Sequence, residues 1–214
     1  MSQNKIKFFD SNCHPNVNGY WLKKKINNDF NSLKNSIDKN DLMGCLAVGL
    51  ENIDNYDIYS FINECQKYSN IIPIAGINPI SNGFKNEIQE ISNLGYRGIK
   101  IHPRFSNIDL KESQKLLFDN IKFCNEHNLL VLFCTYFNNK EGGYIIENPK
   151  NYMNDLLEHC YETKIILMHT GYMLFNDFLT TLLKFNNVLF DFSYTIMNIK
   201  TSKNRKELKD IINN

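Results

Sequence analysis

The sequence lacks several features that would assign a protein to a functional class at once. Positive and negative side chains nearly balance, with 24 Lys and Arg against 23 Asp and Glu, so no basic field predicts nucleic acid or an anionic membrane as partner. No apolar run reaches the roughly 18 residues of a membrane span. The apolar part of the start MSQNKIKFF is too short for a signal peptide. We therefore expect a cytoplasmic protein without nucleic-acid or membrane partners.

Cysteine pairs with metal-site or redox spacing are missing as well. The chain has 6 cysteines, but no C-x-x-C pair occurs, so neither a zinc ribbon nor a disulfide framework is indicated. Cys45 lies in a strand-like run, and three others lie on apolar helix faces, namely Cys65, Cys124 and Cys160. We interpret these four as small buried hydrophobic residues. Cys13 and Cys134 lie at predicted strand ends instead.

Short apolar runs alternate with amphipathic segments along the chain. The runs are rich in β-branched and aromatic residues, as strands buried on both faces should be, and they lie at 5–12, 44–50, 71–77, 97–103, 129–136, 164–170 and 187–193. Between them, apolar residues at helical spacing predict helices around 58–65, 84–91, 117–124, 153–160 and 175–182. Gly95 should end the second of these helices. No linker interrupts the pattern, so we expect a single domain over residues 1–214.

This alternation predicts a TIM-barrel-like α/β fold. An open dinucleotide-binding sheet is disfavoured because no glycine-rich fingerprint follows the first strand. Polar residues instead collect at the carboxyl ends of five strands, where α/β barrels build their active sites, and they are Asn12, His14, Lys100, His102, Cys134, His169 and Asp191. Such barrels have eight strands and roughly 250 residues. With seven strands in 214 residues, the eighth is expected to be missing and the domain to be incomplete at its C-terminal end.

Several segments resemble one enzyme family. DSNCH, residues 10–14, resembles the Asp-x-His-x-His signature of the amidohydrolase superfamily, whose members are metal-dependent hydrolases on a distorted α/β barrel. Four further segments are similar, in order, to the fourth to seventh strands of its second subgroup: GYRGIKIHPRF, LLVLFCTY, KIILMHTGY and NNVLFDFSY. The resemblance covers nearly the whole chain. It implies a barrel in which a metal-activated water attacks a carbonyl-type carbon.

The resemblance also implies a set of metal ligands, from which this sequence departs. The family uses two histidines on strand one, a histidine on strand five, often one on strand six, and an aspartate on strand eight. Here His14 and His169 are kept, while Asn12 and Cys134 replace the other two histidines, and residues 201–214 look like a helix rather than an eighth strand. Imidazole and thiolate are good zinc ligands and an amide oxygen is a poor one, so His14, Cys134 and His169 would hold zinc with a position left for water. The alternative is a decayed site.

The remaining polar residues suggest substrate contacts. Lys100 and Arg104 are expected to hold a carboxylate or phosphate, with Tyr136 and Tyr172 lining the same mouth. His102 or Asp191 would transfer the proton. The loop 137–151, with a Gly142–Gly143 pair, is either a lid or an ordinary surface excursion.

Two classes of function remain open. The first is a metal-dependent hydrolase, or a related lyase, that acts on a small anionic carbonyl substrate with zinc as its cofactor. The second is a catalytically decayed barrel that binds a ligand or partner without turnover. A nuclease-type relative is disfavoured by the near-neutral charge. In either class, a seven-stranded barrel has unpaired edges at the gap between its first and last strands. We expect either a homo-oligomer formed through this gap or a longer natural chain that closes it with a strand carrying an aspartate.

Overall fold

Seven parallel strands form a single curled sheet. In this computed structural model, residues 7–138, 145–174, 178 and 184–195 are described, apart from the side chains of Tyr172 and Met173. The sheet order is β1-β4-β5-β6-β7-β8-β9. The strand bounds are Phe9–Cys13 for β1, Gly44–Val48 for β4, Ile71–Gly76 for β5, Gly98–Ile101 for β6, Leu130–Cys134 for β7, Ile165–Met168 for β8 and Val188–Phe190 for β9. The seven strands and their parallel arrangement as most of a barrel confirm the predicted fold class.

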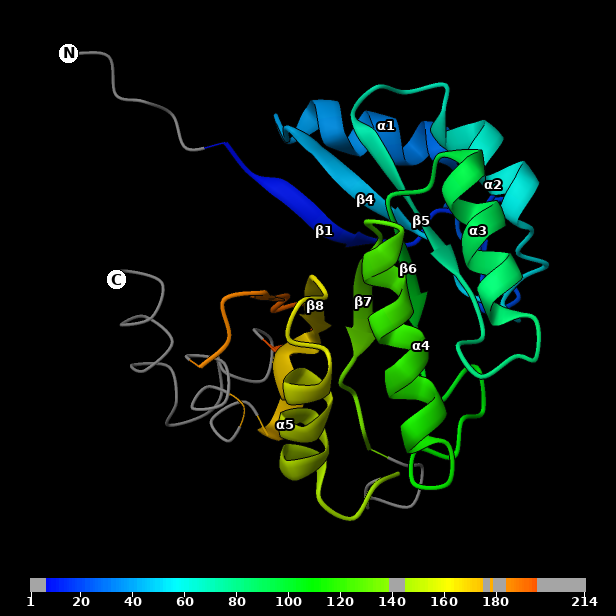
Figure 1. The fold of residues 1–214 in the computed structure, drawn as a ribbon. Coiled ribbons are helices and arrows are strands. Elements are labelled where there is room, and N and C mark those ends of the chain that lie inside the picture. Colours follow the sequence, from blue (N-terminus) through cyan, green and yellow to red (C-terminus); the bar gives the residue numbers. More distant parts are fainter. Residues whose placement is uncertain (1–6, 139–144, 175–177, 179–183, 196–214) are drawn as a thin grey trace.

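The helices lie on the outer side of the curved sheet (Figure 1). Their bounds are Phe30–Lys39 for α1, Ile58–Cys65 for α2, Phe84–Leu94 for α3, Gln114–Glu126 for α4 and Pro149–His159 for α5, with a 3-10 turn at His169–Leu174. The predicted apolar faces of α2 to α5 are buried in one hydrophobic cluster against the sheet. Gly95 ends α3 in the left-handed conformation, at φ 96°, as the sequence indicated.

The concave face of the sheet has its own apolar cluster, made by alternate residues of the strands. Because neighbouring residues in register point to the same face, side chains of β4, β5, β7 and β8 meet there, namely Leu46, Val48, Ile74, Leu132, Ile166 and Met168. Lys100 of β6 is in register with Leu132 of β7. Its side chain is therefore directed to the inside of the half-barrel.

β1 contains a bulge that changes which side chains face the inside. Asp10 is in register with Cys45 and Cys13 with Ala47, so three steps along β1 match two along β4. In a regular strand the side chains of Asp10, Asn12 and His14 would all lie on one side, and this is how the sequence pattern is read. This was wrong for Asp10, which is exposed and accepts a hydrogen bond from the Asn12 N–H at 3.0 Å, because a bulge re-aims the residues around it.

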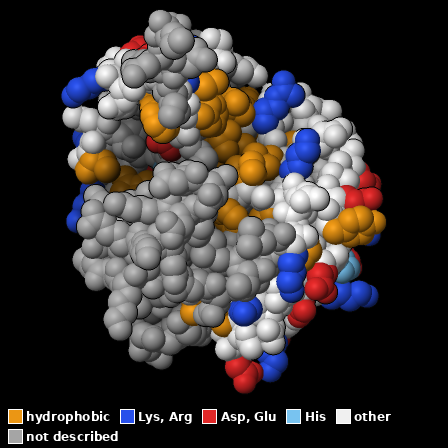
Figure 2. Space-filling view, turned by 90° about the vertical axis from the view of Figure 1, so that its left-hand side faces the viewer, with side chains coloured by type: hydrophobic (Ala, Val, Ile, Leu, Met, Phe, Trp, Pro, Cys, Tyr) orange, Lys and Arg blue, Asp and Glu red, His pale blue; other side chains and the backbone are white. Residues whose placement is uncertain are grey.

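Two described elements were not predicted, namely α1 and a hairpin of β2 (Tyr20–Trp21) with β3 (Lys24–Lys25). Parts of other predictions lie outside the described residues: the Gly142–Gly143 pair, most of the 175–182 helix and the 201–214 tail. All six cysteines are free thiols. No helix of the described residues is long and apolar enough to cross a membrane. Some apolar side chains remain exposed in this part of the chain, such as Phe8, Met43 and Leu189, and hydrophobic side chains are visible on the face shown in Figure 2.

Candidate active site

A cavity of about 590 Å³ opens at the carboxyl ends of the strands. It gathers most of the predicted site residues, which are Asn12, His14, Lys100, His102, Arg104, Tyr136 and His169. The sequence had identified these positions as residues of one barrel mouth, together with Tyr172, whose side chain lies outside the described part of the structure. It had not identified Trp21 and Asn28 of the hairpin region or Ser193, which also line the cavity. No Asp or Glu is among the described residues that line it.

His14 is fixed in a single orientation by its backbone and ring contacts. Its Nδ1 lies 2.9 Å from the carbonyl oxygen of Val48, so this nitrogen carries the proton and donates. The ring stacks on Trp21 with centroids 5.3 Å apart. Burial, aided by the charge of Lys100, lowers the pKa of His14 to about 3. His14 is therefore a neutral imidazole whose Nε2 is left as an acceptor.

Lys100 is the most unusual side chain of the cavity. It is 2% exposed, and its Nζ has no hydrogen-bond partner among the described residues. Burial lowers its pKa, while the negative charges of Cys134 and Asp191 oppose this shift. A buried donor without a partner costs folding free energy, on the order of 1–3 kcal/mol. The chain therefore retains this group at a cost to its stability.

Cys134 lies behind the cavity wall, in contact with two of the histidines. It is 1% exposed, and this burial alone would raise its pKa. Electrostatic attraction by His102 and Lys100, together with hydrogen bonds from His102 and His169, lowers the pKa by more than burial raises it. The pKa of the Cys134 thiol is therefore held well below its usual range. The Phe105 N–H donates to Nδ1 of His102 at 3.4 Å, so Nε2 is the ring nitrogen left for Cys134.

Asp191 supports the site from beneath instead of lining it. Its carboxylate accepts hydrogen bonds from Ser11 Oγ at 3.0 Å, from the backbone N–H groups of His169 and Ser193 at 3.3 and 3.2 Å, and from Ser193 Oγ. His169 in turn has its Nδ1 at 2.9 Å from Ser193 Oγ and 3.1 Å from the Ser193 carbonyl. With four donors on one buried carboxylate, the geometry favours a positioning role over the proton transfer that the sequence suggested.

The predicted metal ligands lie around one cavity but do not form a ligand set. Among the described residues, no group of three or more His, Cys, Asp or Glu side chains is arranged to hold a metal ion. Cys134 is engaged by His102 and His169, and Asn12 uses its Nδ2 on Ser193 Oγ at 3.1 Å. These residues do not fit the three-ligand zinc site. The reaction proposed below therefore uses the side chains of the chain itself.

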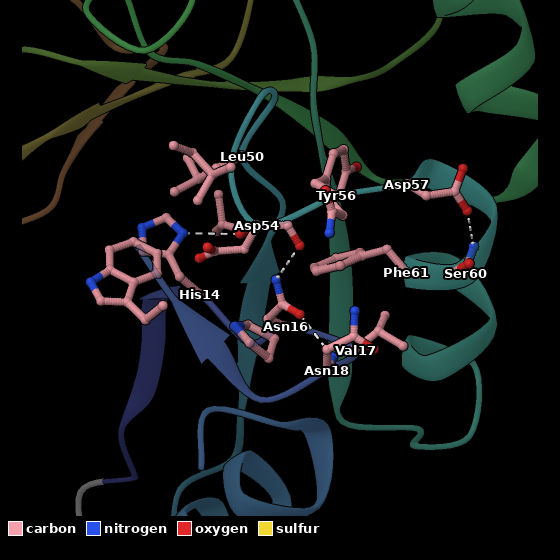
Figure 3. A pocket seen from close by; sticks show the side chains of 15 residues that line it. His14, Asn16, Val17, Asn18, Leu50, Asp54, Tyr56, Asp57, Ser60 and Phe61 are labelled. Atoms are coloured by element: carbon pink, nitrogen blue, oxygen red, sulfur yellow. Dashed lines mark hydrogen bonds between the residues drawn. The ribbon is translucent and has the colours of Figure 1, made fainter. Parts of the chain in front are cut away.

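A second, smaller cavity of about 150 Å³ lies between the loop after β1 and the start of α2. His14 lines both cavities. Figure 3 shows His14 and Asn16 at one side of the smaller cavity and Asp57 and Ser60, at the first turn of α2, at the other. Asn16 donates to the Asp54 carbonyl at 3.2 Å, and Asp57 accepts from the Ser60 N–H at 2.8 Å as the helix cap. These contacts are those of an ordinary capped loop.

Comparison with known proteins identifies the fold. No protein-family model and no curated protein matches the chain. Among solved structures, an uncharacterised TIM-barrel protein of Bordetella bronchiseptica has a TM-score of 0.66 at 13% identity, over 86% of this chain and 74% of that one. A probable 2-pyrone-4,6-dicarboxylic acid hydrolase of Acinetobacter baumannii, solved with citric acid bound, has a TM-score of 0.57 at 14% identity, over 87% of this chain and 70% of that one. An amidohydrolase of Burkholderia multivorans with bound HEPES has a TM-score of 0.60 at 10% identity, over the same shares of the two chains, 87% and 70%.

These neighbours define the class of fold. The chain has the half-barrel form of a TIM barrel, and its structural neighbours include amidohydrolase-type hydrolases, as the resemblance of the five sequence segments predicted. At identities of 10–14%, the likeness is one of fold. The chemistry of the cavity has to be argued from its own residues.

Proposed function

We propose that this protein is a hydrolase-like enzyme, or a related lyase, that acts on a small carbonyl compound carrying a carboxylate. One observation carries the proposal. The cavity is lined by Lys100, Arg104 and three histidines, whereas no Asp or Glu lines it among the described residues. An anionic ligand would find donors on several sides and no like charge.

Arg104 is suited to hold the carboxylate at the mouth. It is exposed, and its guanidinium lies over the Tyr136 ring at 4.2 Å from the centroid. Stacking on the ring restricts the guanidinium plane while its N–H groups remain able to form the paired hydrogen bonds that carboxylates accept. Lys100 lies deeper, where its Nζ can donate to the carbonyl oxygen of the same ligand.

His102 and Cys134 are suited to move the proton. His102 lines the cavity and bonds to Cys134, whose thiolate form is favoured by its surroundings. Nδ1 of His102 would take a proton from the attacking water in place of its hydrogen bond from the Phe105 N–H, which is long at 3.4 Å. Cys134, bonded to the other ring nitrogen, would stabilise the imidazolium that results. Lys100 would stabilise the charge that develops on the carbonyl oxygen. In this scheme Asp191 acts through Ser193 and His169, as a positioning residue.

The name of one structural neighbour supports this substrate class. A 2-pyrone-4,6-dicarboxylic acid is a cyclic ester that carries carboxylates, and the neighbour named for its hydrolysis was solved with citric acid, itself a carboxylate. A metal-dependent form of the reaction, with zinc on His14, Cys134 and His169, is what the sequence resemblance implies, but the side chains of these described residues do not form such a ligand set. Elemental analysis of the purified protein tests it, because stoichiometric zinc would require these side chains to rearrange around the ion.

Calorimetry with small carboxylates tests the main proposal. Citrate and short dicarboxylates should bind, whereas the corresponding uncharged amides should not. Turnover is then followed by the absorbance of 2-pyrone-4,6-dicarboxylate and of simpler lactone carboxylates. Binding without any turnover would favour the second class of function, a barrel that binds a ligand without catalysis. Equal binding of acids and amides would contradict the proposal altogether.

A further inference from the structure

The amine of Lys100 calls for a role that the anion-binding function does not require. It lies on the inner face of β6, in register with the apolar Leu132, and it lines the cavity while being 2% exposed. Its Nζ has no hydrogen-bond partner among the described residues. A lysine that only held an anion could sit at the rim, as Arg104 does, with its charge in water.

The surroundings of Lys100 favour the neutral amine over the ammonium. An ammonium has three hydrogens to satisfy, and burying it without acceptors costs several kcal/mol. Two negative groups act on Lys100, but neither is free to pair with it. Cys134 is engaged by His102 and His169, and the oxygens of Asp191 already accept four hydrogen bonds from other donors. A neutral amine keeps its lone pair on nitrogen, and burial is one of the ways in which proteins make a lysine nucleophilic.

We infer that Lys100 is a covalent nucleophile, whose amine forms an imine with an aldehyde or ketone that also bears a carboxylate. The carboxylate would be held by Arg104, so this inference rests on the proposed function for its substrate class and narrows it. It also selects the lyase branch, because an imine is an electron sink for breaking a bond next to the former carbonyl carbon.

The chemical step balances within the cavity. The lone pair of Nζ attacks the carbonyl carbon and forms the C–N bond, while the π electrons of the carbonyl move to its oxygen. That oxygen takes up one proton from the amine, relayed by His102 on the same cavity wall. A second proton from the nitrogen then reaches the hydroxyl group, the C–O bond breaks, and one water leaves as the C=N bond forms. No oxidant or metal takes part.

Reductive trapping tests the inference on the intact chain. The protein is incubated at neutral pH with glyoxylate and cyanoborohydride, and in parallel with propionaldehyde, which has no carboxylate. Intact-mass and peptide analysis should find one reduced adduct per chain, located on Lys100. Glyoxylate should label Lys100 faster than propionaldehyde, since only glyoxylate can use Arg104. The exposed lysines are protonated at this pH and should label slowly.

Matched variants separate the possible outcomes. K100M and K100R should lose the adduct, whereas K115M, which removes a lysine exposed on α4, should keep it. Circular dichroism checks that each variant is folded. Adducts spread over exposed lysines with Lys100 unmodified by both aldehydes would overturn the inference. Equal labelling of Lys100 by both aldehydes, in a protein that binds no carboxylate, would support Lys100 as the nucleophile but would refute the carboxylate-bearing substrate and the proposed function.

Discussion

The Ser11 hydroxyl donates to Oδ2 of Asp191 at 3.0 Å, and this bond ties the first strand of the sheet to the segment after the last, 180 residues away. A second bond runs beside it, from Asn12 Nδ2 to Ser193 Oγ at 3.1 Å. β1 and β9 are the two ends of the strand order. Side chains therefore join the two edges at the mouth of the half-barrel. The self-association expected through this edge stays a prediction.

Removing the Asp191 carboxylate should destabilise the fold much more than removing Ser11. D191A would leave four partly or fully buried donors without their acceptor, and we expect a loss of about 3 kcal/mol in the free energy of unfolding. S11A removes one of these bonds and should cost about 1 kcal/mol. Urea denaturation of both variants measures the difference. Equal losses would mean that Asp191 contributes no more than a single hydrogen bond.

The sequence predicted the sheet well because its strands are continuous apolar runs. Each of the seven predicted strands overlaps an observed one, and the helices that cover them show the predicted buried faces. The hairpin was missed for a specific reason. Its turn places Leu22 and Lys23 at positive φ, 48° and 67°, where Asn-Gly would be the recognisable signal. The short helix α1 was missed because few of its side chains are apolar, and only Phe30 and Ile37 are fully buried.

The location of the site was predictable, whereas its hydrogen bonding was not. Strand ends of a barrel converge, so the set from Asn12 to His169 could be placed at one mouth from the sequence pattern alone. No sequence signal indicates that Trp21 folds over His14. The Ser11 that bonds to Asp191 lies within the bulged part of β1, and a single extra residue in a strand leaves no compositional trace.

Stability should fall in mild acid because of His14. In the unfolded chain this histidine takes up a proton below its ordinary pKa of 6.5, whereas in the folded protein its pKa is about 3. Between these values the unfolded state binds one more proton, so stability rises with pH and is lost as pH falls, by about 1.4 kcal/mol per pH unit for one such group. Urea denaturation at several pH values from 6.5 to 4 should show a free energy of unfolding that falls more steeply with decreasing pH in the unmodified protein than in H14Q. Parallel curves for the two proteins would contradict it.

Arg104 should determine the affinity for carboxylates. Replacing it by Gln in R104Q removes the paired, charge-assisted hydrogen bonds, and we expect affinity for a bound dicarboxylate to fall by about tenfold to a hundredfold, corresponding to roughly 1.5–3 kcal/mol. The matched control is R97Q, since Arg97 is an exposed arginine directly before β6, at its other end. Isothermal calorimetry compares the variants. A similar loss in R97Q would indicate a general charge effect.

Replacing Lys100 should make the protein more stable while it removes the function. The methionine in K100M has a similar length and no polar group, and it would join the apolar side chains of the inner face around Leu132. Because the buried amine has no partner among the described residues, its removal should raise the free energy of unfolding by about 1–2 kcal/mol. K100A is the control for packing, since it also removes the amine but leaves a cavity, and it should be less stable than K100M by about 2 kcal/mol or more. Thermal and urea denaturation measure the relative stability of the unmodified protein, K100M and K100A. If K100M is less stable than the unmodified protein, the amine has a stabilising partner and is not the free nucleophile inferred above.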